Sequence, residues 1–182
     1  MLILYIFAGL LIMLLILALV AAFMSFVVLL MLRVPFVRTP KHAIDALVAS
    51  KLIGEHDLVY DLGAGDGKFL QQLVRATGCK AEGFELSPFF WLLGELRASK
   101  STRWAMHMQN VIHIDLSEPT VIFTFLAPAG LPALSRKLQD ETRPGQTIIS
   151  YGFELPGWSP TQVIDPMPEN PKGSKFYVYR KT

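Results

Sequence analysis

The sequence predicts an α/β protein in which a doubly wound, mostly parallel sheet follows one N-terminal transmembrane helix. Three observations support this prediction. Residues 1–32 contain no charged side chain. Further along, short apolar runs alternate with segments whose apolar residues recur at helical spacing, a pattern typical of parallel sheets covered by helices. At residues 58–74, a buried strand leads through a glycine-rich turn into a helix, which is the first half of a βαβ unit.

The first segment, residues 1–32, exceeds the roughly 20 apolar residues that a membrane-spanning helix needs. A cleaved signal peptide fits poorly, because no Lys or Arg precedes the run and its length far exceeds an apolar region of about 7–15 residues. We therefore expect an uncleaved single-pass anchor that contacts the membrane through residues 2–32. Arg33, Arg38 and Lys41 precede the first acidic residue, so the positive-inside rule places the rest of the chain in the cytoplasm.

Residues 33–41 are predicted to form a linker and pre-motif segment, and residues 42–182 the folded domain. The linker contains two prolines, each of which favours extended geometry in the residue before it. We expect Thr39 to cap a helix that has Pro40 in its first turn. We expect Gly54 to end that helix.

The remaining elements follow from the same two periodicities. Ser87 is expected to cap one helix, and Leu131, Leu134 and Leu138 mark the apolar face of another. Later strands are predicted at residues 79–85, 104–113, 120–126 and 146–151, with a closing hairpin formed by residues 163–164 and 176–179. In such sheets, ligands bind at the carboxyl ends of the strands.

The turn after the first strand indicates the kind of ligand. Gly63, Gly65 and Gly67 allow positive φ and close approach of a ligand to backbone N–H groups at a helix N-terminus. Their spacing differs from the G-x-G-x-x-G of dinucleotide sites. Carboxylates beside the turn, including Asp61, would repel a pyrophosphate but suit a cationic ligand. Glu85, at the end of the next strand, stands where a carboxylate accepts hydrogen bonds from ribose hydroxyls.

This D-x-G-x-G-x-G pattern with its following glutamate resembles motif I of class I S-adenosylmethionine (SAM)-dependent methyltransferases. The resemblance implies a Rossmann-like, seven-stranded methyltransferase sheet and SAM as the cofactor. A glycine turn in another α/β domain is the competing interpretation.

Other function classes find no support in the sequence. The four histidines lack metal-ligand spacing, so no metal site is expected, and hydrolase and nucleotide-triphosphate motifs are missing. The formal net charge of +2 is too small to indicate nucleic acid as a partner. Cys79 is the single cysteine, which excludes an intramolecular disulfide and is expected to pack in the core.

Four further segments, at residues 36–40, 115–126, 134–141 and 149–160, carry a narrower resemblance. They are similar to segments of one branch of these enzymes, the small protein lysine methyltransferases. That branch includes archaeal broad-specificity enzymes and mitochondrial enzymes acting on adenine nucleotide translocase or the ATP synthase c subunit. Arg38, in the first segment, departs from the pattern, because the branch has a proline there.

The resemblance implies roles for particular residues. Asn110 is similar to the residue that contacts the adenine amino group, and Thr39 and Pro40 are expected to fold over the cofactor. Phe125 and Trp158 are candidates for the walls of an acceptor channel, although either could be core. Glu154 is a candidate general base, but no sequence pattern identifies the base.

Three functional classes remain open. The favoured prediction is a membrane-anchored methyltransferase that acts on lysine side chains of protein substrates, which could themselves be membrane-associated. The second is a methyltransferase for a small-molecule or lipid acceptor, which the anchor would also suit. The third is a non-catalytic SAM-binding membrane protein.

Overall fold

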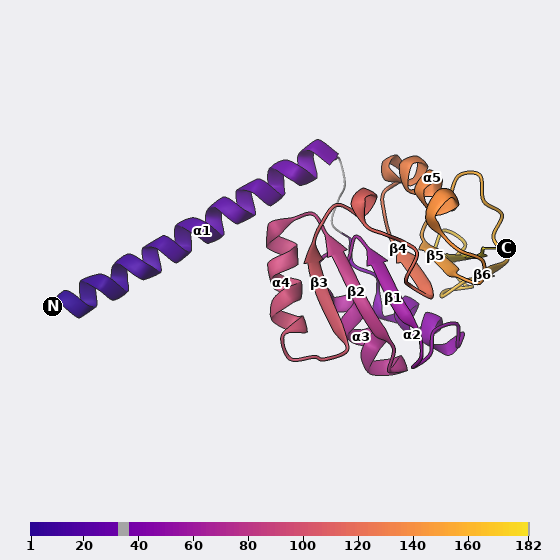
Figure 1. Cartoon of the computed structure of the whole chain (residues 1–182), viewed down its shortest axis with the longest axis horizontal. Helices are drawn as coiled ribbons and strands as arrows, with labels where there is room; N and C mark the ends of the chain where they lie inside the picture. Colours follow the sequence, from indigo (N-terminus) through magenta and orange to yellow (C-terminus); the bar gives the residue numbers. More distant parts are fainter. Residues whose placement is uncertain (33–36, 182) are drawn as a thin grey trace.

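We analysed a computed structural model of the chain, which describes residues 1–32 and 37–181, with the backbone alone at residues 28–32. The expectations for Arg33 and for the first part of the linker therefore lie outside the described residues. Within the described part, seven strands form one sheet in the order β3-β2-β1-β4-β5-β7-β6 (Figure 1). The strands are β1 (Leu58–Leu62), β2 (Lys80–Glu85), β3 (Trp104–Met108), β4 (Val121–Thr124), β5 (Thr147–Tyr151), β6 (Gln162–Ile164) and β7 (Phe176–Arg180).

Strands β1 to β5 pair in parallel, whereas β7 runs antiparallel to both β5 and β6. The predicted doubly wound sheet and its closing hairpin are thereby confirmed. The strand order reverses between β1 and its neighbours β2 and β4, which makes the carboxyl end of β1 the switch point where ligands bind in such sheets.

Helices cover both faces of the sheet, which explains why β4 and β5 are buried along their whole length. Leu47, Leu70 and Leu73 pack on one face, against Phe123 of β4. Leu134 and Leu138 pack on the opposite face. The helices are α1 (Leu2–Leu32), α2 (Lys41–Ala49), α3 (Lys68–Thr77), α4 (Pro88–Ala98) and α5 (Leu131–Glu141), with short 3-10 turns η1 (Val111–His113) and η2 (Pro128–Gly130).

Helix α2 has different ends from those predicted. Pro40, rather than Thr39, occupies the N-cap position, and no side chain caps the helix there. The helix ends at Ala49, well before Gly54, because Ser50 forms the C-cap and its hydroxyl donates to the Leu47 carbonyl at 2.6 Å. Lys51 then adopts a positive φ of 56°, which stops the helix.

Helix α1 extends away from the domain and approaches it only near its own C-terminal end (Figure 1). Its stretch Leu2–Val27 is long and apolar enough to cross a membrane. Most of its described side chains are exposed, but Ser25 is buried against α4. Helix α4 begins at the predicted cap, where the Ser87 hydroxyl accepts from the Phe90 N–H.

Candidate functional site

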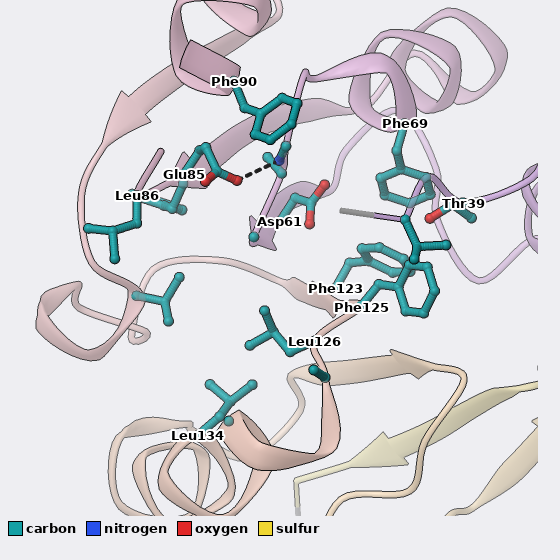
Figure 2. A pocket seen from close by; sticks show the side chains of 18 of the residues that line it. Thr39, Asp61, Phe69, Glu85, Leu86, Phe90, Phe123, Phe125, Leu126 and Leu134 are labelled. Carbon is teal, nitrogen blue, oxygen red and sulfur yellow. Dashed lines mark hydrogen bonds between the residues drawn. The ribbon is translucent and has the colours of Figure 1, made fainter. Parts of the chain in front are cut away.

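A cavity of about 720 Å³ opens at the carboxyl ends of β1, β2 and β4 (Figure 2). This volume lies within the range of about 300–1,000 Å³ that is usual for small-molecule sites. The glycine turn, the end of β2, the η1 segment, the end of β4 and the residues before α2 all contribute to its lining. The cavity therefore lies at the switch point of the sheet.

The glycine turn forms the floor of the cavity, and its conformation requires glycine. Gly63, Gly65 and Gly67 have φ of 102°, 56° and 71°, which side chains rarely adopt. A Cβ on Gly63 would approach Leu126 Cδ2 to 2.9 Å. Gly67 does not line the cavity; its Cβ would meet the Trp104 ring at 2.9 Å, so this glycine allows α3 to pack closely.

Glu85 joins the floor to the wall that follows β2. Its Oε2 accepts a hydrogen bond from the Gly65 N–H at 2.9 Å, and its Oε1 accepts one from the Ser87 N–H at 2.7 Å (Figure 2). Burial raises the pKa of the Glu85 carboxyl, although these N–H donors oppose the shift. The carboxylate is therefore held in a fixed orientation at the rim of the turn.

Asp61 is the next-to-last residue of β1 and points into the cavity with 3% of its surface exposed (Figure 2). Within the described residues, no hydrogen-bond donor or cation pairs with its carboxylate. Burial, followed by the charge of Glu85, raises the pKa of Asp61 well above its usual value. A cationic group entering the cavity would relieve this cost, because it would favour the charged carboxylate.

Asp66, in the same turn, holds an ion-pair cluster that the sequence did not predict. Arg38 Nη2 lies 2.7 Å from Asp66 Oδ2, and Arg97 Nη2 lies 3.3 Å from the same oxygen. Through its ion pair, Arg38 fastens the segment before α2 onto the glycine turn. Thr39 consequently lines the cavity, whereas Pro40 does not.

Asn110 lines the cavity beyond the end of β3. Its Oδ1 accepts from the Ile112 N–H at 3.0 Å, and this contact starts the η1 turn and shortens the strand predicted for residues 104–113. The neighbouring wall is apolar and includes Leu86 and Ile112. A flat organic group can therefore lie between apolar side chains, beside a side-chain amide.

The three acceptor-channel candidates occupy different surroundings. Phe125 lines the cavity, with its ring edge-on to Tyr151 at a centroid distance of 4.8 Å. Trp158 lies outside the lining and is partly buried, packing edge-on against the core residue Tyr179 at a centroid distance of 5.8 Å. Glu154 is exposed and also lies outside the lining.

Two residues that the sequence analysis missed line the cavity near Phe125. Phe153 follows β5, and Ser174 precedes β7. Ser174 also forms a side-chain hydrogen bond with Tyr151. Loop conformation brings these residues together, and no periodic pattern in the sequence marks either one.

The arrangement of groups in the cavity defines its ligand chemistry. Backbone amides, two carboxylates and apolar walls suit an organic cation that carries hydroxyl groups and a flat ring. Within the described residues, no group of three or more His, Cys, Asp or Glu side chains has the geometry of a metal site.

Comparisons with known proteins agree with this chemistry. The sequence model of the ANTKMT methyltransferase domain family matches residues 61–162 of this chain. A protein-lysine N-methyltransferase of Saccharolobus islandicus is 32% identical over 136 residues, which cover 72% of this chain and 84% of that enzyme. The adenine nucleotide translocase lysine N-methyltransferase of Mus musculus is 33% identical over 138 residues, which cover 73% of this chain but only 59% of that enzyme.

A solved structure is also similar. The crystal structure of an RNA methyltransferase from Salinibacter ruber in complex with S-adenosyl-L-homocysteine has a TM-score of 0.71 and 26% sequence identity. The matched region covers 79% of this chain and 93% of the chain of the RNA methyltransferase.

Proposed function

The chain belongs to the ANTKMT methyltransferase domain family and is a SAM-dependent methyltransferase, and we propose that it methylates lysine side chains of protein substrates while anchored in a membrane. The lysine assignment rests on the two relatives that are more than 30% identical, because both carry the name of lysine N-methyltransferases. The membrane assignment rests on the apolar helix α1.

In this proposal, the cavity binds SAM in one orientation. The backbone of Gly63 and Gly65 receives the methionine half, whose ammonium faces the carboxylate of Asp61. Glu85 accepts hydrogen bonds from the ribose hydroxyls, and Asn110 contacts the adenine amino group. Glu85 supports this orientation, since its two bonds to backbone N–H groups already fix its carboxylate at the rim of the turn.

Thr39 lines the side of the cavity that the residues before α2 form. The ion pair of Asp66 with Arg38 holds the segment before α2 against the glycine turn, and Thr39 thereby becomes part of the lining. Closing this side of the cavity would exclude water from the reacting atoms.

SAM supplies a methyl group on a cationic sulfonium, and transfer is an in-line displacement in which alignment of the acceptor provides much of the rate. An acceptor lysine with an ordinary pKa near 10.4 is mostly protonated at pH 7. Phe125 and Phe153 form an aromatic wall of the cavity. Such apolar surroundings lower the pKa of an amine, so they would favour the neutral, nucleophilic form.

The position of Glu154 gives no support to a role as the base, since its side chain is exposed outside the lining. We propose instead that the acceptor lysine loses its proton to solvent before it enters the aromatic part of the cavity. The described lining near Phe125 and Phe153 offers the Ser174 hydroxyl, which can accept a hydrogen bond from the neutral amine.

Anchoring would place this site beside a bilayer. We propose that residues 1–32 span the membrane once, that residues 42–182 form the methyltransferase domain, and that the domain lies in the cytoplasm, where the basic residues after the anchor favour it. Protein acceptors near the membrane surface are then the most accessible substrates.

The test is methyl transfer from tritiated SAM to membranes and cytosol of a strain lacking the gene, with the full-length enzyme added in vesicles. Label in a protein band, located on a methylated lysine by mass spectrometry, is the expected result. Label in the lipid extract would instead assign a lipid acceptor, and label in RNA a nucleic-acid acceptor. Cofactor binding without transfer to any fraction would contradict the activity itself.

A further inference from the structure

Ser25 joins the apolar helix α1 to the domain. Its hydroxyl is buried and donates to the Ala21 carbonyl at 2.8 Å. The same oxygen accepts from Ser87 Oγ at 2.8 Å and from the Phe89 N–H at 3.1 Å. The first N–H groups of a helix lack partners within that helix, so α1 supplies a second cap to α4. The contact between α1 and α4 is therefore a specific one.

The position of Ser25 along α1 determines where this contact lies in a membrane. Leu2 to Ser25 spans 23 residue steps, which at a rise of 1.5 Å per residue is about 35 Å. The hydrocarbon core of a bilayer is about 30 Å thick. The part of α1 before Ser25 is thus long enough to cross the core alone. With residues 2–25 placed across the core, Ser25 and the N-terminus of α4 lie at the level of the lipid headgroups, and residues 26–32 continue the helix beyond that level.

Helix α4 exposes apolar side chains beside this contact. Phe89, Leu92 and Leu96 recur at helical spacing, with exposed fractions of 37%, 46% and 62%. Leu86, just before the helix, is 42% exposed. We call these residues the α4 apolar face, and Figure 1 shows that α4 lies at the edge of the domain nearest α1. Contiguous exposed apolar side chains mark interaction surfaces.

We propose that the α4 apolar face lies in the interfacial layer of the bilayer that α1 crosses, so that the domain rests on the membrane in a fixed orientation. The inference depends on the proposed membrane anchoring. The bilayer is the occupant because the hydrogen bonds of Ser25 hold the N-terminus of α4 at headgroup level. Lys100, exposed just after α4, can reach anionic headgroups.

This orientation also places the active-site cavity. Leu86 belongs to the α4 apolar face and also lines the cavity. Ser87 and Phe90, which are near it in the sequence, line the cavity too. One wall of the cavity is therefore built from the segment that contacts lipid. An acceptor lysine would be received at the membrane surface, which favours lysines that lie close to a bilayer over lysines of freely diffusing proteins.

The test uses lipid-depth measurements on the full chain in vesicles of phosphatidylcholine and phosphatidylglycerol. The variants Leu92→Cys and Leu96→Cys each carry a small fluorophore on the added cysteine, and the control variant Asp140→Cys carries it on an exposed position of α5. Cys79 is fully buried, and the parent chain measures its background labelling. We expect quenching by a lipid-borne doxyl group at positions 92 and 96, and quenching by aqueous iodide at position 140.

The outcomes separate the inference from the anchoring on which it rests. Vesicle flotation reports the anchoring, so failure to float would refute the anchor itself. A chain that floats while positions 92 and 96 respond to iodide as position 140 does would overturn the docking alone. Protection from iodide that persists in detergent and increases with protein concentration would overturn it in favour of a second copy.

A second variant tests the contact with α1 directly. Ser25→Leu removes the hydrogen bonds to Ser87 and Phe89 while α1 stays apolar. We expect lipid quenching at position 96 to fall with flotation unchanged, whereas Phe26→Leu, at an exposed neighbouring position, should have no effect. Unchanged quenching in Ser25→Leu would contradict the proposed role of this contact.

Discussion

The variant Glu85→Gln tests the cofactor site most directly. The Glu85 carboxylate accepts from two backbone N–H groups, at 2.9 Å from Gly65 and 2.7 Å from Ser87. Glutamine keeps the volume of the side chain, but it removes the charge and turns an NH₂ donor toward one of these donors. Hydrogen bonds to a charged group contribute about 1.5–3 kcal/mol each. Loss of one such bond to a ribose hydroxyl should weaken SAM binding about 10- to 150-fold.

The assay is isothermal titration of the vesicle-reconstituted or detergent-solubilised full chain with SAM and with S-adenosyl-L-homocysteine. Glu82→Gln is the matched control, because Glu82 belongs to the same strand but contacts His107 at 3.3 Å and lies outside the cavity lining. The control should bind SAM as the parent does. Thermal melting of both variants shows whether the fold is retained.

One result would refute the reasoning about Glu85. If Glu85→Gln binds both ligands within about threefold of the parent, which is well below the expected loss, its carboxylate does not contact the ribose. If the variant melts at a much lower temperature, its dissociation constant is measured below that temperature and compared with that of the parent in the same way.

Three further predictions concern the glycine turn and its neighbours. Burial raises the pKa of Asp61, so its protonated form stabilises the folded chain fully below the unfolded pKa, and this contribution is lost as pH rises through the folded pKa. A bound ammonium should displace the proton of Asp61, so SAM affinity should rise with pH between the unfolded and the folded pKa of this carboxyl. Calorimetric titrations in buffers of different ionisation enthalpy should detect the released proton, and Asp61→Asn should abolish this release. Gly67→Ala should lower the free energy of unfolding by about 2–5 kcal/mol in urea titrations, since positive φ costs about 1–2 kcal/mol and overpacking about 1–3 kcal/mol, whereas Gly130→Ala, with open space at its Cβ, should not. Arg38→Ala should change the melting temperature little, because this ion pair is partly exposed and Arg97 remains on the same carboxylate, yet it should weaken SAM binding by loosening Thr39.

Sequence patterns predicted the elements of the fold because those elements depend on local periodicity. The buried runs at β1, β4 and β5 bury side chains on both faces, and such strands are recognisable without knowledge of their neighbours. The predicted C-terminal end of α2 was wrong because a single side chain, Ser50, decided where that helix stops.

The site was predictable only where a residue acts through its place on a strand or turn. Asp61 and Glu85 lie at the ends of adjacent parallel strands, so their positions in the sequence bring them to the same edge of the sheet. The ion pair of Arg38 with Asp66 joins residues that are 28 positions apart, and no local pattern predicts it. Periodicity also could not separate Phe125, which lines the cavity, from Trp158, which is partly buried against the core and lies outside the lining.

Ser87 links helix α1 to the carboxylate of Glu85 in the cavity. Its hydroxyl donates to Ser25 of α1, and its backbone N–H donates to the Glu85 carboxylate. Removing α1 to obtain a more tractable protein would thus delete a hydrogen-bond partner of Ser87, the residue whose N–H donates to the carboxylate that we assign to the ribose. If that contact is coupled to the site, cofactor binding and docking of α1 strengthen each other, and we expect a chain without α1 to bind the cofactor more weakly than the full chain does.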